Sequence, residues 1–205
     1  MTENIITRVG VPEPFNRDRL SQQIRGTGSV PEVGVKILHI DSSQCSSDSR
    51  SDASALVAGL VVDRSDATRA LWIVDVVHGH FTPRELPGRI VDFLVKHQGY
   101  QRASIEKIIG SGFLSALISN ECEKRGIAFP KLLWLPMQVQ ASKARRIGRL
   151  ARLSNENRLF LVAGNWNDAW LDQASKFDPT SKNNHGRGDD LLDASCGLVN
   201  GVFGL

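Results

Sequence analysis

Short runs of apolar and often β-branched residues alternate with polar turns along the chain, and three of them lie close together in its first half. Val35–Ile40, Ser54–Val62 and Ala70–Val77 each have the length and composition of a buried strand. The polar stretch Asp63–Thr68 between the last two is typical of a hairpin turn. Ser42–Ser51 is rich in serine and is expected to be a loop.

Helical spacing alternates with short apolar runs in the rest of the chain. Pro83 opens a helical segment behind Thr82, a residue type favoured at helix caps. Further helices are expected at 112–125, 142–153, 167–175 and 189–199, and further strands at 103–106, 132–135 and 158–162. This order of elements predicts an α/β fold with one central mixed β-sheet and helices on both faces.

Residues 1–33 differ from the rest because they are polar, contain several prolines and glycines, and show no sustained period. We expect them to form a linker or tail with one short helix near 17–24. The domain is expected to span residues 34–205, since 205 residues with 41% hydrophobic content suit one core. No internal repeat or second domain is indicated.

Membrane and secreted proteins are not indicated. No run of about eighteen apolar residues occurs, so we expect no transmembrane helix and no membrane partner. The first fourteen residues lack the charged and then apolar pattern of a secretory signal. The three cysteines lie far apart, which argues against a disulfide framework and a structural zinc site. A reducing, cytoplasmic setting is expected.

Acidic residues stand where the predicted elements end or begin. Asp41 follows the first strand, Glu106 ends a later one, and Asp189 and Asp190 open the last helix with Asp193 one turn further on. Clustered carboxylates repel one another, and a hard cation such as Mg²⁺ or Mn²⁺ relieves this repulsion. Two such ions can activate a water molecule and stabilise the leaving oxygen of a phosphodiester.

Each of these acids also has a simpler interpretation. An aspartate after a strand is commonly a turn or cap residue, and acids at a helix start are favoured by the helix dipole. The order strand-Asp, strand-Glu, Asp-Asp-helix is more specific than any of its members.

Basic residues gather in one part of a chain whose net charge is only +3. Between Lys131 and Phe160 there are seven basic residues and one acid, Glu156. Such a block is a candidate binding surface for an anionic polymer, and the alternative is a solvated helix face. The candidate DNA contacts are Lys143, Arg145, Arg146 and Arg149.

Several segments together resemble one protein family, from about Val35 to Val199. They are LHIDSS at 38–43, SDASALVAG at 51–59, LWIVDVVHG at 71–79, SIEKIIGSG at 104–112, SKARRIGRL at 142–150, FDP at 177–179 and HGRGDDLLDA at 185–194. The chain resembles the C-terminal nuclease domain of the tailed-bacteriophage terminase large subunit, and the closing segment is the most specific. The resemblance implies an RNase H-like fold, with which the predicted element order agrees.

The resemblance also implies roles for the acids. Asp41 would be the first ligand of a two-ion Mg²⁺ or Mn²⁺ site and Glu106 the second. Asp190 or Asp189 would be the third, and Asp190 is favoured. Asp193 could support the site or simply cap a packed helix.

Two departures from the family pattern concern Asp52 and His185. Ser51 replaces the glycine that usually precedes the second acid, so Asp52 could be an accessory ligand or a solvated turn acid. Gly186, Arg187 and Gly188 separate His185 from the aspartate pair, so His185 could support the site or be a loop histidine.

The activity implied is a metal-dependent endonuclease that cuts double-stranded DNA with little sequence preference, as in the packaging of concatemeric viral genomes. Its expected partners are a terminase ATPase domain, the small terminase subunit and the portal, in the cytoplasm of the host cell. No Gly-x-x-x-x-Gly-Lys-Ser/Thr loop occurs, so the ATPase is expected either to have been removed, leaving residues 1–33 as linker, or to lie on another chain. Two alternatives remain: a resolvase or strand-transfer nuclease of the same fold, and a non-catalytic DNA-binding or motor-docking module.

Overall fold

The computed structural model describes residues 14–42, 53–107, 110–136, 143–178, 180 and 189–199. In chain order its elements are α1 (Arg17–Gln22), β1 (Ile24–Arg25), the 3-10 helix η1 (Thr27–Ser29), β2 (Val35–Asp41), β3 (Ser54–Asp63), β4 (Arg69–Gly79), α2 (Leu86–Lys96), β5 (Arg102–Lys107), α3 (Ser111–Lys124), β6 (Leu132–Pro136), α4 (Lys143–Asn155), β7 (Leu159–Val162), α5 (Asn167–Lys176) and α6 (Asp190–Val199).

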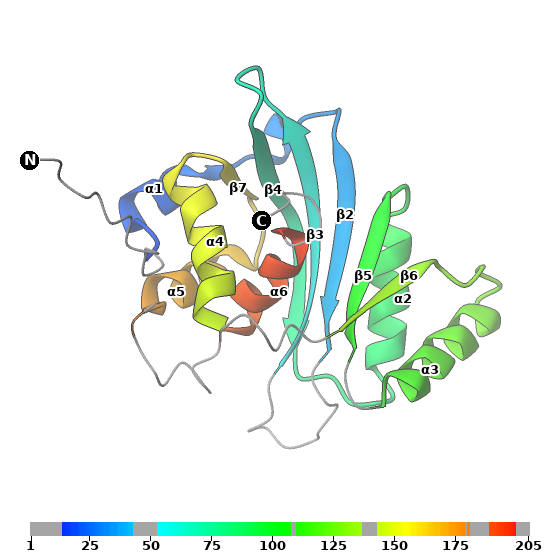
Figure 1. The fold of residues 1–205 in the computed structure, drawn as a ribbon. Coiled ribbons are helices and arrows are strands. Elements are labelled where there is room, and N and C mark those ends of the chain that lie inside the picture. The colour runs from blue at the N-terminus through cyan, green and yellow to red at the C-terminus, as the bar shows by residue number, and fades with distance from the viewer. Residues whose placement is uncertain are drawn as a thin grey trace, which may run out of the picture.

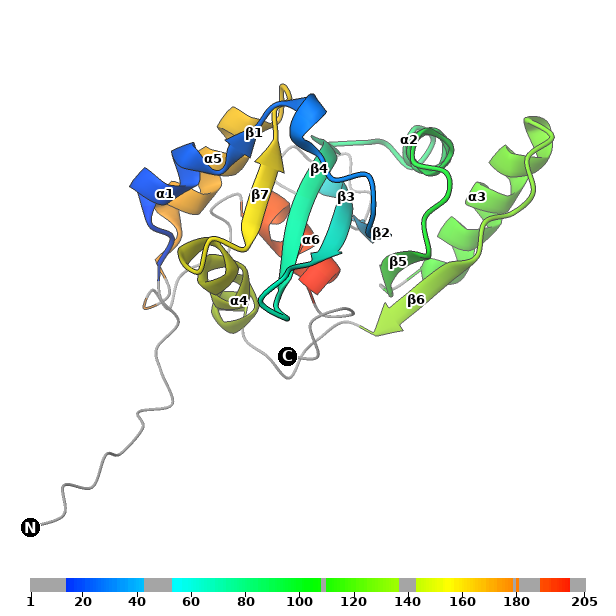
Figure 2. The ribbon, with the colours of Figure 1, turned by 90° about the horizontal axis from the view of Figure 1, so that it is seen from above.

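One mixed sheet of seven strands runs through the molecule in the order β1-β7-β4-β3-β2-β5-β6. The centre is an antiparallel meander of β2, β3 and β4, in which β3 and β4 form the predicted hairpin. Strands β7 and β1 continue the sheet in parallel beside β4, and β5 and β6 continue it in parallel beside β2 (Figures 1 and 2). The predicted mixed sheet is confirmed.

Helices cover both faces of this sheet, because neighbouring residues of a buried strand point to opposite sides. On β2, Ile37 belongs to the core under α1, α4, α5 and α6, whereas Leu38 belongs to the core under α2 and α3. Figure 1 shows the two groups of helices on either side of the sheet. The predicted helices on both faces are confirmed, and no helix of the described residues is long and apolar enough to cross a membrane.

A reciprocal pair of hydrogen bonds precedes helix α2. The Thr82 amide donates to Glu85 Oε2 at 3.0 Å, and the Glu85 amide donates to Thr82 Oγ1 at 3.2 Å. This arrangement satisfies backbone donors that have no partner inside the helix. The helix itself begins at Leu86, with Glu85 as its N-cap residue, so it starts three residues later than Pro83 predicted, and the Thr82–Glu85 bonds belong to the turn before it.

Residues 14–33 pack on the domain, although their polar pattern indicated a linker or tail. Phe15 and Leu20 are buried, and the Phe15 ring meets Trp170 edge-on with centroids 5.6 Å apart. Strand β1 pairs in parallel with β7. The short helix expected near 17–24 is α1. Two apolar side chains and a two-residue strand thus join this segment to the core, which the lack of periodicity did not reveal.

Helix α6 lies closer to the sheet than larger residues would allow. A Cβ added at Gly197 would come within 2.1–2.3 Å of the His39 ring, and one at Gly59 within 2.8 Å of Leu198. The two glycines therefore let the helix rest directly on β2 and β3. This contact brings the acidic start of α6 to the end of the sheet where β2 and β5 stop.

Candidate active site

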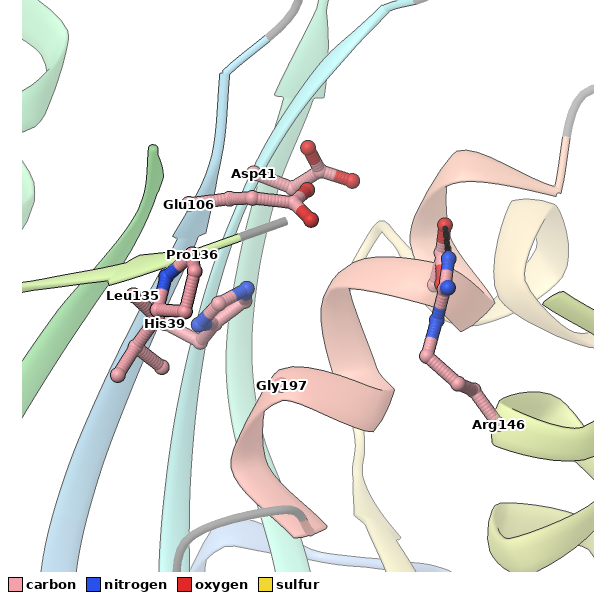
Figure 3. A pocket seen from close by; sticks show the side chains of 8 residues that line it. His39, Asp41, Glu106, Leu135, Pro136, Arg146 and Gly197 are labelled. Atoms are coloured by element: carbon pink, nitrogen blue, oxygen red, sulfur yellow. Dashed lines mark hydrogen bonds and ion pairs between the residues drawn. The ribbon is translucent and has the colours of Figure 1, made fainter. Parts of the chain in front are cut away.

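Two acids of neighbouring strands meet at one edge of the sheet. Asp41 is the last residue of β2, and Glu106 is the last residue but one of β5, which pairs with β2 in parallel. The pairing ends at Ile40 opposite Ile105, so the two acids stand at the next position of each strand. Figure 3 shows both carboxylates pointing into the same space.

The space in front of these carboxylates is a small pocket between the sheet and two helices. Its lining residues come from β2, β5, β6, α4 and α6 and are His39, Asp41, Glu106, Leu135, Pro136, Arg146, Asp193 and Gly197. Its volume is about 30 Å³, which suits an ion or a water molecule and is too small for a nucleotide. A DNA phosphate would therefore have to lie at the mouth of this pocket, because the pocket cannot enclose a nucleotide.

The three acids of the α6 start have different partners. Asp189 forms an ion pair with Lys143 of α4. Asp193 accepts a two-pronged set of hydrogen bonds from Arg146 at 2.8–3.0 Å and lies 3.7 Å from Lys143 Nζ. Asp190 lies 4.0 Å from His78 Nε2 of β4. Two cations of α4 thus neutralise part of the acidic cluster.

The pKa of Asp41 is affected by most of the charged side chains of the cluster. Burial raises the pKa of its carboxyl well above the ordinary value, and the charges of Glu106, Asp193 and Asp190 raise this pKa further. Lys143 opposes the shift. Removal from water and repulsion between like charges both favour the protonated form. A divalent cation in the pocket would act in the opposite direction.

The pKa values of Asp190 and Lys143 are shifted in the directions expected for oppositely charged neighbours. Burial alone would raise the pKa of Asp190, but the interaction with His78 and the charge of Lys143 bring it below the ordinary value. Burial alone would lower the pKa of Lys143, but Asp189, Asp193 and Asp190 bring it above the ordinary value. Asp190 is therefore held as a carboxylate and Lys143 as a cation.

His39 is a buried polar side chain on the same strand as Asp41. Its ring shares a hydrogen bond of 2.9 Å between Nδ1 and Ser104 Oγ of β5. Burial lowers the pKa of His39 to about 4, and the positive charge of Arg102 acts in the same direction. The ring is therefore neutral at physiological pH.

The comparisons with known proteins concern the fold. No protein-family model and no curated protein matches the sequence. Among solved structures, the large terminase nuclease from thermophilic phage G20c superposes with a TM-score of 0.50. The match has 18% identity and covers 81% of each chain.

The fold is RNase H-like.

Two further structures of similar proteins have lower scores. The large terminase nuclease domain of Thermus phage P74-26 matches at 17% identity and a TM-score of 0.46, over 88% of this chain and 91% of that one. RuvC of Thermus thermophilus matches at 10% identity and a TM-score of 0.42, over 83% of this chain and 97% of that one. At these identities the likeness concerns the fold alone. The chemistry of the site has to be inferred from its side chains.

In this RNase H-like fold the predicted acids are brought together to different degrees. Asp41 and Glu106 line the pocket, while Asp190 stands beside His78 and Asp189 turns to Lys143. Asp193, expected only as a supporting residue, lines the pocket itself. Asp52 and His185 lie outside the described residues.

The predicted DNA contacts of α4 divide into two pairs. Lys143 and Arg146 contact Asp189 and Asp193 within the acidic cluster. Arg145 is exposed and Arg149 is partly buried. The first pair contacts carboxylates at the start of α6, and DNA contact by either pair stays a prediction.

Two histidines of the site were not among the predicted residues. His39 precedes Asp41 by two positions, so period-two alternation places both on the α6 face of β2. His78 is the last residue but one of β4, within the segment LWIVDVVHG. The alternation was a signal that could have revealed His39, whereas the approach of His78 to Asp190 depends on tertiary packing.

The donor set suits a hard divalent cation, although its geometry is incomplete. Asp41, Glu106 and the α6 acids offer carboxylate oxygens, the ligands that Mg²⁺ and Mn²⁺ prefer. Across the part of the chain that the structure describes, no three acidic, histidine or cysteine side chains lie close enough to hold one ion. Asp189 and Asp193 are instead paired with cations of α4.

Proposed function

We propose that this chain is a metal-dependent endonuclease that hydrolyses double-stranded DNA with little sequence specificity. The observation that carries the proposal is the acidic pocket at the end of β2 and β5, which Asp193 and Gly197 of α6 also line. Acids that crowd one another in a half-buried pocket cost free energy unless a cation joins them. The RNase H-like fold agrees with this chemistry.

The residues proposed to hold Mg²⁺ or Mn²⁺ are Asp41, Glu106 and Asp190. Asp41 is the central member because it interacts with both Glu106 and Asp190. Asp193 would join them on leaving Arg146, and Asp189 is a weaker candidate because it faces Lys143. When bound, two such ions would activate a water molecule and stabilise charge on the leaving oxygen. Asp52 remains a candidate accessory ligand outside the described residues.

The reaction is hydrolysis of a phosphodiester. The oxygen of water forms a bond to phosphorus, one P–O ester bond breaks, and the released oxygen takes up a proton. The carboxylates do little proton transfer themselves in this scheme. Their task is to hold positive charge in the pocket, and Leu135 and Pro136 close one wall of it.

The proposed substrate is double-stranded DNA, held by α4. Arg145 is exposed on this helix and Arg149 lies one turn further on. Guanidinium contacts to phosphates give affinity without reading sequence. Arg146 would join these contacts once Asp193 no longer binds it.

The biological role that we propose is the cutting of concatemeric viral genomes during DNA packaging. The segments shared with the terminase family, among them HGRGDDLLDA at 185–194, support this role. The role would require a terminase ATPase domain, a small terminase subunit and a portal as partners, in the cytoplasm of the host cell.

A plasmid-cleavage assay tests the proposal. Wild-type protein in Mg²⁺ or Mn²⁺ should convert supercoiled DNA to nicked and linear forms, and EDTA should stop the reaction. Asp190→Ala, Asp41→Ala and Glu106→Ala should each lower cleavage by at least about a hundredfold, because each removes a proposed metal ligand. Circular dichroism should show that the variants remain folded.

Asp172→Ala is the matched control, since Asp172 is an exposed acid on α5 that pairs with Lys176. It should cleave like the wild type. Retained Mn²⁺-dependent cleavage by purified Asp41→Ala would contradict the proposed site, and a strong preference for branched over linear DNA would favour the resolvase alternative.

A further inference from the structure

His39 lies beside the proposed metal ligands and is not one of them. It stands two residues before Asp41 on β2, on the face covered by α6, with only 6% of its surface exposed. Its ring packs against Gly197 of α6 and forms part of the wall of the acidic pocket. A polar ring in such a place is either a structural link or a group that acts on the contents of the pocket.

The hydrogen bonds of Ser104 determine which ring nitrogen carries the proton. The Ser104 hydroxyl donates its single hydrogen to the Leu38 carbonyl oxygen at 3.2 Å. Because a carbonyl oxygen can only accept, we assign the hydroxyl hydrogen to Leu38 and the proton of the His39–Ser104 pair to Nδ1. In a neutral ring, Nε2 therefore carries the lone pair.

The free nitrogen of the ring is directed at the pocket. Figure 3 shows the imidazole reaching from β2 into the space below the carboxylates of Asp41 and Glu106. Within the described ranges, the contact to Ser104 is the one hydrogen bond recorded for this ring. The packing on Gly197 fixes the plane of the ring, so the direction of the lone pair is fixed as well.

We propose that His39 accepts, through Nε2, a hydrogen bond from a water molecule in the acidic pocket and so orients that water for attack on the DNA phosphate. This inference rests on the proposed nuclease function. The pocket volume of about 30 Å³ suits one such water, and Ser104 and Gly197 serve as the supports that hold the ring. Orientation of a reactant is worth large rate factors when the groups are held rigidly.

Two amide substitutions separate this role from a structural one. Asparagine at position 39 can keep a polar atom near the place of Nδ1 and hence the bond to Ser104, but it offers nothing at the place of Nε2. Glutamine reaches the place of Nε2 with an oxygen that can accept from water. We expect kcat of His39→Asn to fall by about tenfold to a hundredfold, with KM for DNA changed by less than about twofold. His39→Gln should recover most of the lost rate.

Measurements that do not depend on cleavage complete the test. In ¹⁵N-histidine NMR spectra of the wild type at neutral pH, Nε2 of His39 should resonate as an unprotonated ring nitrogen and Nδ1 as a protonated one. Calorimetry should give His39→Asn a Mn²⁺ affinity within about threefold of the wild type, because the proposed partner of the ring is water. His97→Asn is the matched control, since His97 binds Asp75 outside the pocket, and it should cleave normally.

The outcomes are distinct. A wild type that cuts no DNA would overturn the nuclease proposal and this inference with it. An active wild type with His39→Asn at full rate, or with Asn better than Gln, would overturn the role of His39 alone. Loss of Mn²⁺ binding in His39→Asn would make the ring a metal ligand and equally overturn it, as would a protonated Nε2 in the NMR spectra.

Discussion

The pKa of Asp41 depends on burial and on the charges of its neighbours in the site. Burial raises its pKa first, and Glu106, Asp193 and Asp190 add to the shift. A carboxyl whose folded-state pKa is raised binds more protons in the folded than in the unfolded chain between the two values. Folding stability therefore falls as pH rises above the ordinary value of 3.8 toward the raised one.

Replacing Asp41 by asparagine should consequently stabilise the metal-free protein. In EDTA at pH 7 we expect the unfolding midpoint of Asp41→Asn to rise by at least about 2 °C. The gain should shrink as pH falls and vanish below about pH 4, where the aspartate is protonated in both states. Thermal unfolding followed by circular dichroism measures both effects. Asp172→Asn should show no such gain, and a wild type as stable as the variant at pH 7 would contradict the charge crowding.

At the same scale, the sequence could indicate Asp41 and Glu106 but not the third acid. Strand ends are visible in the apolar runs, so the position of these two residues followed from the pattern. Asp189, Asp190 and Asp193 all lie within one helical turn, and their partners Lys143, His78 and Arg146 come from α4 and β4. Contacts over such sequence distances leave no mark in local periodicity.

Among the elements, α6 packs so closely on β2 that the contact requires a glycine in the helix. The helix reaches β2 only because Gly197 has no side chain, since a Cβ there would lie 2.1–2.3 Å from the His39 ring. Its other end carries Asp190 and Asp193. The distance between α6 and β2 thus controls how closely acids of different elements approach.

Gly197→Ala should therefore disturb both stability and the site. We expect a loss of about 1–3 kcal/mol in the free energy of unfolding, because the helix or the His39 ring must move to admit the methyl group. Urea unfolding measures this loss, and DNA cleavage should fall with it. Gly112→Ala on α3 is the control, because a Cβ there meets nothing within 4 Å. If both variants unfold at the same urea concentration, the contact is looser than described.

Most elements could be predicted because their apolar runs are long enough to show a period. Strands β2, β3 and β4 agree closely with the predicted runs, and the helices differ mainly at their ends. Strand β1 has two residues, too few for any alternation, and was missed. Phe15 and Leu20 are buried by helices distant in sequence, so a polar-looking segment proved to belong to the core.

For the molecule as a whole, the proposed binding of DNA depends on where the charges lie more than on the net charge of +3. Helix α4 places Lys143 and Arg146 against carboxylates, while Arg145 is exposed. The two pairs of cations on this helix therefore lie in different surroundings, and a contact with DNA is predicted for the second pair, Arg145 and Arg149.

Removing Arg145 and Arg149 together should weaken DNA binding without changing its indifference to sequence. In EDTA, the double Gln variant should bind duplexes of different sequence more weakly by a similar factor. The slope of log affinity against log salt should become shallower by about one to two, since each phosphate contact contributes about 0.9. Fluorescence anisotropy measures these slopes.

Arg64→Gln provides the control for this prediction. Arg64 follows β3, whose first residues lie beside Asp41, so it stands at the other end of the sheet. Its loss should leave the salt slope unchanged. Equal slopes for the double variant and the wild type would exclude this face of α4 as the DNA contact.

The ion pairs of Lys143 and Arg146 mean that this acidic site carries counterions on its own chain. Asp189 is paired with Lys143, and Asp193 is paired with Arg146. Under the proposed function, a turn of either carboxylate to a bound ion would release its cation beside the DNA backbone.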